Sequence, residues 1–253
     1  DGPGIRTTVF LKGCPLRCPW CHNPEGQSLY PELLFSESRC IEGCEECLRV
    51  CPNNIDPRIE LNRIQDNRCI MECGKCIEVC PTEAITIVGE VVRVEDVLRM
   101  VLSDLVFYKV SGGGVTLSGG EPLFGKAFTI ALLHSFKANG IHTAIETCCY
   151  GDPSIVQTLI NYVDLFIIDI KFGHSDDYER YASAEDGSII FRNLRNIMQS
   201  KVPKIIRFPC VPGYTDSAEN IEAIIHELAS YQIENLLRFE VLSYNELGEG
   251  KYI

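Results

Sequence analysis

The sequence predicts an α/β protein with a parallel sheet and a separate cysteine-rich domain near the amino terminus. Two observations predict this fold class. Six short apolar runs alternate with segments of helical periodicity, which is typical of repeated β/α units. A cysteine-rich segment of about fifty residues follows the first of these runs, although a β-to-α connection is ordinarily only a few residues long. The segment must therefore be a domain of its own.

Six strands are predicted from apolar runs that end at polar or glycine-rich segments. The runs are Thr7–Leu11, Gly114–Leu117, His142–Thr147, Leu165–Ile170, Lys204–Phe208 and Arg238–Leu242. Six β/α units would make a partial (β/α)6 barrel, similar to a TIM barrel that is not closed. In β/α barrels the chemistry gathers at the carboxyl ends of the strands. Polar side chains at these ends are therefore the first candidates for a site.

Helices are predicted from apolar stripes with helical spacing. One stripe comprises Val94, Val97, Leu98, Val101, Leu102 and Leu105, and another comprises Ile221, Ile224, Ile225 and Leu228. The second of these helices is expected to begin with the capping pair Asp216 and Glu219. Asp152 followed by Pro153 predicts the start of a further helix.

The cysteine-rich segment contains two copies of the pattern C-x3-C-x2-C-x3-C-P. The first copy has Cys40, Cys44, Cys47 and Cys51, and the second has Cys69, Cys73, Cys76 and Cys80. Bacterial two-cluster ferredoxins carry C-x2-C-x2-C-x3-C-P, in which the fourth cysteine binds the other cluster. By this rule Cys80 joins the first three cysteines of the first copy, and Cys51 joins the first three of the second.

Zinc held by four thiolates is the alternative for these cysteines. The C-P endings and the duplicated quartet favour two iron–sulfur clusters. The first gap is one residue longer than in the ferredoxins, which leaves the geometry at Cys40 and Cys69 open. The ferredoxin-like domain is expected over residues 35–88, and the barrel over residues 1–34 and 89–253.

A third cysteine pattern, C-x3-C-x2-C, comprises Cys14, Cys18 and Cys21, directly after the first predicted strand. Three thiolates can hold three corners of a [4Fe–4S] cluster and leave the fourth iron without a protein ligand, whereas an electron-transfer cluster normally uses four cysteines. An open metal position is a place for chemistry. On spacing alone, an incomplete zinc site or three unrelated thiols would also be consistent.

The composition limits the classes of binding partner and predicts the cellular compartment. A net charge of −12 argues against binding to nucleic acid or anionic membranes, which requires basic patches. No apolar run approaches the roughly 18 residues of a membrane span, and no signal peptide is visible. Eleven of fourteen cysteines have metal-type spacings, which predicts a reduced, cytoplasmic and oxygen-sensitive protein. The remaining Cys148, Cys149 and Cys210 are expected to be small buried hydrophobes.

Together, several motifs resemble the radical S-adenosylmethionine (SAM) superfamily, and within it the activating enzymes of glycyl-radical enzymes. The motifs are DGPGIRT at Asp1–Thr7, the Cys14–Cys21 triplet, SGGEP at Ser118–Pro122, ET at Glu146–Thr147, DIK at Asp169–Lys171, and Arg207 ahead of VPG. The resemblance runs over essentially the whole chain and implies the same partial barrel. Family members begin earlier than DGPG, so both termini look trimmed.

The resemblance implies a radical SAM oxidoreductase. Such an enzyme reductively cleaves SAM at the open cluster and uses the 5′-deoxyadenosyl radical to abstract a hydrogen from a backbone glycine of a partner enzyme. The implied cofactors are SAM, three [4Fe–4S] clusters and a monovalent cation near Asp169. The implied partners are a glycyl-radical enzyme and a flavodoxin or ferredoxin that donates electrons. The Asp1–Gly4 segment would help to receive the partner's glycine loop.

The resemblance also implies roles for individual residues. Ser118, Gly119, Gly120 and Glu121 would hold the methionine end of SAM, with the glycines allowing close backbone approach and Glu121 pairing with the ammonium group. Arg207 would bind the SAM carboxylate through its guanidinium fork. The remaining SAM contacts are expected from Trp20, Cys21, His22, Glu146, Asp169, Ile170, Lys171 and Asn245. The catalytic residues would be Cys14, Cys18, Cys21 and Lys171.

One position departs from the family pattern. Asn245 stands where relatives often carry a histidine that contacts the SAM ribose; an amide can hydrogen-bond a hydroxyl, but no acid–base role carries over. His134, His142, His174 and His226 have no ligand-like spacing and are expected to be ordinary residues.

Each motif also has a purely structural interpretation. SGGEP could be a strand-to-loop turn, Asp169 and Lys171 an ion pair that caps the sheet, and Arg207 a surface residue. Trp20 and His22 are expected to shield the cluster and pack beside adenine, although a loop aromatic that fills the barrel mouth would look the same.

Two other functions compete with the activating enzyme. A radical SAM enzyme could act on a small molecule or peptide, but peptide maturases carry additional cysteines in a carboxyl-terminal domain and no cysteine follows Cys210. A polyferredoxin electron carrier would leave SGGEP and DIK unexplained. Family activases with a two-cluster insert serve lyases, decarboxylases and dehydratases, so pyruvate formate-lyase is not the expected target.

Overall fold

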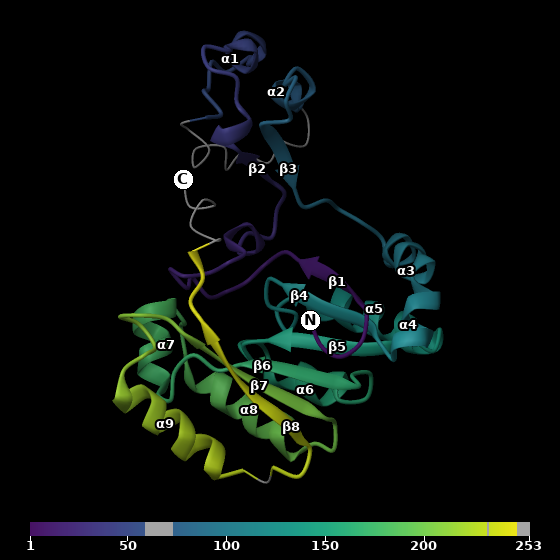
Figure 1. Cartoon of the computed structure of the whole chain (residues 1–253), viewed down its shortest axis with the longest axis vertical. Helices are drawn as coiled ribbons and strands as arrows, with labels where there is room; N and C mark the ends of the chain where they lie inside the picture. Colours follow the sequence, from purple (N-terminus) through teal and green to yellow (C-terminus); the bar gives the residue numbers. More distant parts are fainter. Residues whose placement is uncertain (59–72, 232, 247–253) are drawn as a thin grey trace. The chain divides into compact units, whose positions relative to one another are not determined.

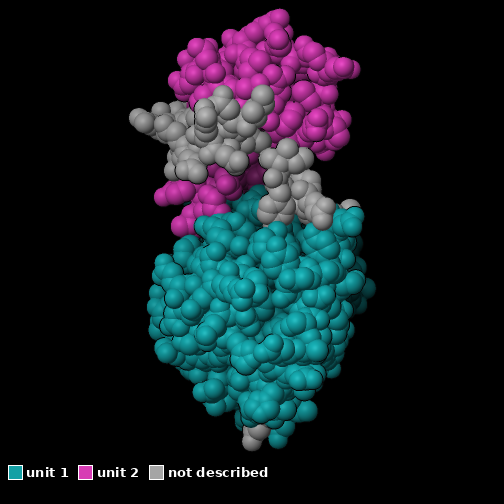
Figure 2. All heavy atoms as spheres, turned by 90° about the vertical axis from the view of Figure 1, so that its left-hand side faces the viewer, with its two compact units in different colours: residues 1–27, 92–253 teal, residues 28–91 magenta. Residues whose placement is uncertain are grey.

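The structure is a computed structural model that describes residues 1–58, 73–231 and 233–246 (Figure 1). It divides into two compact units (Figure 2). Unit 1 comprises residues Asp1–Gln27 and Val92–Ile253, and unit 2 comprises residues Ser28–Val91. Unit 2 is wider at both ends than the expected range 35–88. The boundary lies outside that range because strand β2 (Glu32–Phe35) pairs with β3 (Ile85–Val88) inside unit 2.

Unit 1 is built on a six-stranded parallel sheet, as predicted. The strands in spatial order are β1 (Arg6–Leu11), β4 (Gly114–Gly119), β5 (His142–Thr147), β6 (Leu165–Asp169), β7 (Lys204–Cys210) and β8 (Leu236–Ser243). All six predicted strands are present, and their ends differ from the predicted ones by two residues at most. The parallel register brings all six carboxyl ends to one edge of the sheet, where the predicted site residues lie.

Seven α-helices accompany this sheet in the described part of unit 1. They are α3 (Val94–Ser103), α4 (Leu105–Ser111), α5 (Lys126–Ala138), α6 (Pro153–Leu159), α7 (Ser175–Ala182), α8 (Ser188–Gln199) and α9 (Ala218–Ala229). A single 3-10 turn, η1 (Pro24–Gly26), follows the cysteine triplet. No helix within the described ranges has the length and apolar character needed to cross a membrane.

Two predicted helix boundaries were wrong. The predicted helix that runs to Leu105 is interrupted at Asp104, which separates α3 from α4. The Asp104 carboxylate accepts a hydrogen bond from the Thr7 hydroxyl at 2.6 Å. Helix α9 begins after Ser217, whose hydroxyl caps the Asn220 N–H at 3.2 Å, so Asp216 is not the cap. The predicted cap at Asp152 is confirmed, since its side chain accepts from the Ser154 N–H at 2.8 Å.

The two faces of the sheet differ because side chains alternate along each strand. One face carries large apolar residues such as Leu117, Phe166 and Ile206, which form one hydrophobic cluster with residues of the helices. On the other face, a small separate cluster contains Ala144, Leu165, Ile167 and Ile205. Beyond this cluster, toward the carboxyl ends, the same face carries polar side chains. This face of the sheet therefore carries polar side chains at the carboxyl ends of the strands and the small apolar cluster nearer their amino ends.

Unit 2 is a small unit with little regular structure. Strands β2 and β3 form an antiparallel pair, and the short helices α1 (Glu46–Val50) and α2 (Lys75–Glu78) each follow a cysteine of the repeat. A 3-10 turn, η2 (Glu37–Arg39), leads into Cys40. Residues 59–72, which include the first cysteine of the second copy, lie outside the described residues.

Candidate functional site

A cavity of about 410 Å³ lies in unit 1 at the carboxyl ends of the strands. It brings together most of the residues predicted from sequence. These are Cys14, Cys18, Trp20, Cys21, His22, Ser118, Gly119, Gly120, Glu121, Glu146, Asp169, Lys171 and Arg207. Residues from β1, β4, β5, β6 and β7 thus meet in one place, as the parallel topology requires.

The cysteine loop follows β1 and is tied to the end of β4 through backbone contacts. The Gly13 N–H donates to the Gly26 carbonyl at 2.8 Å, and the Glu121 N–H donates to the Gly13 carbonyl at 2.9 Å. A Cβ at Gly120 would lie 2.4 Å from the Gly13 oxygen. The sequence predicts that Gly120 makes room for a ligand. Its missing side chain also makes room for the backbone of the cysteine loop. SGGEP and the cysteine triplet can therefore lie side by side in one site.

The three thiols of the triplet are largely enclosed. Burial raises the pKa of Cys18 to about 12 and also raises the pKa of Cys21. The pKa of Cys14 is lowered, chiefly because the Cys148 thiol hydrogen-bonds to it. Because metals bind the thiolate, iron must displace the protons of Cys18 and Cys21.

The donor set and the surrounding shape fit an iron–sulfur cluster. Three soft sulfur ligands line one cavity together with backbone that has no side chain at Gly119 and Gly120. Among the described residues, no group of three or more His, Cys, Asp or Glu side chains is arranged around a single metal-ion position. The thiolates of a [4Fe–4S] cluster bind different iron atoms, so they do not converge on one point.

Glu121 is the most enclosed acidic residue of the site, with 2% of its surface exposed. Its Oε1 accepts hydrogen bonds from the Leu123 N–H at 3.0 Å and the Thr147 hydroxyl at 2.6 Å. Its Oε2 accepts from the N–H and from the thiol of Cys148, both at 2.8 Å. Burial raises the pKa of this carboxyl, while the four donors favour its charged form. SGGEP is therefore not a turn with an exposed glutamate.

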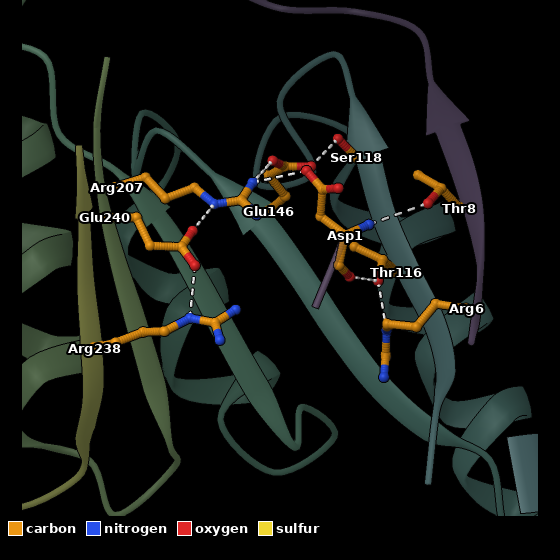
Figure 3. Close-up of polar contacts among 9 residues, drawn as sticks. All are labelled: Asp1, Arg6, Thr8, Thr116, Ser118, Glu146, Arg207, Arg238 and Glu240. Carbon is orange, nitrogen blue, oxygen red and sulfur yellow. Dashed lines mark hydrogen bonds and ion pairs between the residues drawn. The ribbon is translucent and has the colours of Figure 1, made fainter. Parts of the chain in front are cut away.

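Arg207 is surrounded by three carboxylates (Figure 3). Its Nη1 contacts both Glu146 and Asp1, the latter at 2.8 Å, and its Nε donates to Glu240 at 2.9 Å. Only 8% of the residue is exposed, so it is not the surface arginine of the structural alternative. The predicted contact with a SAM carboxylate would have to compete with these acidic partners.

The Arg207 cluster is extended by neighbouring polar groups. The Ser118 hydroxyl donates to Glu146 at 2.6 Å, which joins β4 to β5. The Thr116 hydroxyl donates to the Asp1 carbonyl at 2.6 Å, and the Arg6 Nε donates to Thr116 at 2.8 Å. Asp1, the first residue of DGPG, thus lies against the polar face of the sheet, as Figure 3 shows.

Asp169 and Lys171 lie on the same face, as alternation predicted. Although burial works against it, the field of Asp169 holds the pKa of Lys171 well above its ordinary value. Their backbone is secured from α9: the Asn220 amide donates to the Lys171 carbonyl at 3.0 Å and accepts from the Gly173 N–H at 2.9 Å. The Asp169 Oδ1 is buried without a hydrogen-bond partner among the described residues, so it is available to a ligand.

Trp20 and His22 lie in aromatic surroundings at the cavity wall. The Trp20 ring is 4.8 Å from the ring of Tyr214 and 6.0 Å from that of Phe172, between centroids. The His22 ring is 6.1 Å from that of Tyr244. Trp20 is 8% exposed and thus serves as a packed wall of the site.

Two predicted site residues do not line the cavity. Ile170 is buried in the hydrophobic cluster on the opposite face, because it alternates with Asp169 and Lys171. Asn245 is exposed and lies just beyond the lining, whereas its neighbours Ser243 and Tyr244 belong to it. The side chains of Ile170 and Asn245 therefore lie outside the lining of the cavity, and the contact of these residues with SAM stays a prediction.

Sequence reasoning missed several lining residues. Thr8 and Phe10 of β1 line the cavity, and Phe10 is 61% exposed. The two-residue alternation of this strand could have identified both, since it places them on one face. Tyr244 and Cys148 carry no comparable signal in the sequence.

The three leftover cysteines differ from one another. Cys148 and Cys149 are buried, as expected. Cys210 is only half-buried at the end of β7, so the expectation of burial was wrong for it. Cys148 is not an inert hydrophobe either, because its thiol donates to Glu121.

Unit 2 brings together the cysteines of one predicted cluster. Cys40, Cys44, Cys47 and Cys80 line a small cavity together with Arg58, whose guanidinium donates to the Cys44 carbonyl at 3.1 Å. Cys51, Cys73 and Cys76 are half-buried. Cys69 lies outside the described residues. The cavity supports the assignment of Cys80 to the first copy of the repeat.

Three family models match the chain. The Radical SAM superfamily matches residues 67–228, a 4Fe-4S dicluster domain matches residues 32–82, and a 4Fe-4S single cluster domain matches residues 1–50. The chain also aligns over 98% of its length with a crystal structure of Streptococcus suis SuiB bound to precursor peptide SuiA, covering 41% of that chain. The TM-score is 0.56 at 15% identity, which shows a shared fold only.

Curated relatives are similar over the whole of this chain. The benzylsuccinate synthase activating enzyme of Thauera aromatica is 44% identical over 262 residues, with 77% of its length covered. The isethionate sulfite-lyase activating enzyme of Oleidesulfovibrio alaskensis is 42% identical with 82% covered, and the trans-4-hydroxy-L-proline dehydratase activating enzyme of Clostridioides difficile is 39% identical with 83% covered. The chain therefore belongs to the radical SAM superfamily and, within it, to the activating enzymes of glycyl-radical enzymes.

Proposed function

We propose that the cavity of unit 1 is the place where this chain activates a glycyl-radical enzyme, using SAM and a cluster held by Cys14, Cys18 and Cys21. One observation carries the proposal: the three thiols, the SGGEP backbone and Lys171 line a single cavity at the carboxyl ends of parallel strands. This is the location of chemistry in β/α folds. The partner's backbone glycine is the substrate.

The finer architecture is part of the same proposal. The six-stranded sheet of unit 1 is a partial (β/α)6 TIM-like barrel, and unit 2 is an inserted bacterial-ferredoxin-like domain. It holds two [4Fe–4S] clusters, one on Cys40, Cys44, Cys47 and Cys80 and one on Cys51, Cys69, Cys73 and Cys76. With the cluster of unit 1, the chain carries three clusters. The cavity shared by Cys40, Cys44, Cys47 and Cys80 supports the exchange of fourth cysteines between the copies.

The chain's own residues bind and orient. The chemistry supplied by a cluster with bound SAM is one-electron cleavage of the sulfonium followed by hydrogen abstraction. Glu121 provides the negative charge for the SAM ammonium, and the Gly119 and Gly120 backbone lies beside it. Lys171 places a positive charge at the wall of the same cavity, where its raised pKa keeps it protonated. Trp20 and His22 restrict the access of water.

The electron donor and the cation are also part of the proposal. A flavodoxin or ferredoxin supplies the electron, and the clusters of unit 2 relay electrons or shape the surface that receives the partner. A monovalent cation binds beside Asp169, whose buried Oδ1 has no hydrogen-bond partner in the described part of the chain. Eleven cysteines in cluster-type spacings support a cytoplasmic protein, because thiolate ligands need reducing conditions.

The test is anaerobic reconstitution of the full chain with iron and sulfide, followed by SAM, dithionite and the glycyl-radical enzyme encoded beside its gene. A glycyl radical detected by electron paramagnetic resonance (EPR) on the partner is the expected result. Cys18→Ala should abolish the signal, whereas Cys210→Ala, which removes a cysteine outside every proposed ligand set, should retain it. SAM cleavage that never produces a radical on any glycyl-radical enzyme would contradict the proposal.

A further inference from the structure

Cys148 lies between two groups that the proposed function assigns to different tasks. It follows β5 directly, is 8% exposed, and its thiol donates to the Glu121 Oε2 at 2.8 Å. Cys14 and Cys148 line the same cavity, and the Cys148 thiol is close enough to Cys14 to lower the pKa of Cys14. Cys148 is therefore in contact with both the carboxylate proposed for the SAM ammonium and a proposed cluster ligand.

The hydrogen bonds of Glu121 leave no room for a further donor. A carboxylate has about four lone-pair sites, and Glu121 already accepts from Leu123, from Thr147 and twice from Cys148. An ammonium group can bind Glu121 only if one donor withdraws. The Leu123 and Cys148 N–H groups are fixed in the backbone, and the thiol is a weaker donor than the Thr147 hydroxyl. The Cys148 thiol is thus the donor that gives way.

A displaced thiol has a second acceptor within reach. A thiol carries one hydrogen, so it can donate to Glu121 or to the Cys14 sulfur but not to both. The Cys14 sulfur is anionic when it binds iron, which makes it a good acceptor. Rotation about one side-chain bond is enough to exchange the two acceptors, and no proton leaves Cys148.

We propose that Cys148 is a positioning residue that couples the two halves of the site. Its S–H orients the Glu121 carboxylate while no ammonium is bound, and it turns to the sulfur of Cys14 when an ammonium group occupies Glu121. The inference rests on the proposed function, in which Glu121 receives SAM and Cys14 holds the cluster. It predicts that occupation of the SAM site is felt by the cluster through a protein hydrogen bond.

The consequence is a shift in reduction potential. Hydrogen bonds to the cluster sulfurs help to set the reduction potential. A hydrogen bond donated to the Cys14 sulfur stabilises the reduced cluster, because the reduced cluster carries more negative charge. Coupling of this kind is reciprocal, so reduction should tighten SAM binding by the same factor. A weak donor to a charged sulfur is expected to contribute about a three- to tenfold change in the equilibrium constant for reduction.

The first experiment needs neither metal nor SAM. Infrared spectra of the metal-free full chain, kept reduced and anaerobic, should contain a downshifted S–H stretching band that disappears in Cys148→Ala. Cys149→Ala is the matched control: it removes an adjacent buried thiol that makes no hydrogen bond to Glu121 or Cys14 among the contacts of the described residues. The band should persist in that variant. An unshifted Cys148 band would overturn the inference.

The second experiment uses the reconstituted enzyme. The midpoint potential of the unit 1 cluster is titrated with and without SAM by EPR in wild type, Cys148→Ala, Cys148→Ser and Cys149→Ala. The SAM-induced change in the reduction equilibrium should be about three- to tenfold smaller in Cys148→Ala than in wild type. It should be largely restored by the serine hydroxyl and unaltered in Cys149→Ala.

The outcomes separate the inference from the function on which it rests. Equal SAM effects in wild type and Cys148→Ala would overturn the coupling while leaving SAM binding intact. No SAM effect in the wild-type cluster would overturn the proposed function and the coupling together. Urea unfolding of each variant establishes that a changed potential does not come from a poorly folded protein.

Discussion

Arg207 of β7 and Glu146 of β5 form an ion pair across the intervening strand β6, on the polar face of the sheet (Figure 3). Only 9% of the Arg207 side chain and 17% of the Glu146 side chain are exposed. Asp1 and Glu240 share the same guanidinium, so one positive charge balances several negative ones. Such a cluster ties the amino terminus and three strands together at the wall of the cavity.

Arg207→Gln should destabilise the protein by about 3 kcal/mol, because it leaves the enclosed Glu146 carboxylate without a counter-ion. Glu240→Gln should cost less than about 1 kcal/mol, because Arg207 keeps Glu146 and Asp1. The measurement is the free energy of unfolding in urea. Arg49→Gln removes an exposed ion pair with Glu46 and serves as the control, with an effect below about 0.5 kcal/mol. Equal losses for Arg207→Gln and Arg49→Gln would show that the cluster is not needed.

Cys80→Ser should remove the cluster proposed for Cys40, Cys44 and Cys47, because these four thiols line one cavity. About four of about twelve irons per chain should be lost. Cys51→Ser should instead remove the second cluster of unit 2, and the double variant should lose both. Iron and sulfide analysis after anaerobic reconstitution measures this. Cys210→Ser should keep the full iron content. Cys44→Ser/Cys80→Ser should lose no more iron than Cys80→Ser alone, because both thiols are assigned to one cluster. A loss of about eight irons from that double variant would refute the exchanged pairing.

Asn220→Ala should cost about 3 kcal/mol of unfolding free energy, because the buried amide bonds to the Lys171 carbonyl, the Thr215 carbonyl and the Gly173 N–H. Hydrogen exchange at Gly173 should accelerate, since that N–H loses its acceptor. The exposed Asn161 also donates to a backbone carbonyl, and Asn161→Ala should change stability by less than about 0.5 kcal/mol. Unchanged protection of Gly173 in Asn220→Ala would contradict the role of this amide.

Stability should fall as the pH drops below about 6.5, in part because of His142. Burial, with a further contribution from Arg6, lowers the pKa of His142 from the ordinary value of 6.5. At a pH between the two pKa values the unfolded chain binds a proton at His142 and the folded chain does not. The contribution to stability is therefore complete above about pH 6.5 and is lost as the pH falls from that value through the lowered pKa of the folded chain. Unfolding free energies of wild type and His142→Gln should converge from pH 7.5 to pH 5.5. Parallel curves would mean that His142 titrates alike in both states.

Spacing along the chain predicted the elements and the centre of the site. Each strand end carries a motif, and parallel strands bring their carboxyl ends to one edge, so SGGEP, ET and DIK had to meet. The same alternation puts the Ile170 side chain on the face opposite Asp169 and Lys171, in the hydrophobic cluster. The α9 cap was misassigned because Asp216 and Ser217 are both good capping residues, and only the backbone shows which one precedes the first turn.

The contacts of Cys148 could not be predicted from the sequence. It lies in no metal-type spacing, and beside Cys149 it looked like a second small apolar residue. Its acceptor, Glu121, is 27 residues away in the chain and reaches it only because the end of β4 lies beside the end of β5. Arg207 is comparable, since its partner Asp1 is separated from it by 206 residues.

Local pattern was sufficient for the family, the cysteine triplet, the duplicated cysteine copies and six parallel strands. These features depend on periods and spacings of a few residues, which are visible in the sequence itself. Tertiary structure alone decided that Arg207 faces three carboxylates, that Glu121 is saturated with donors, and that Cys148 lies between Glu121 and Cys14. The reason is physical: hydrogen bonds and ion pairs act over a few ångströms, and only folding decides which distant residues come that close.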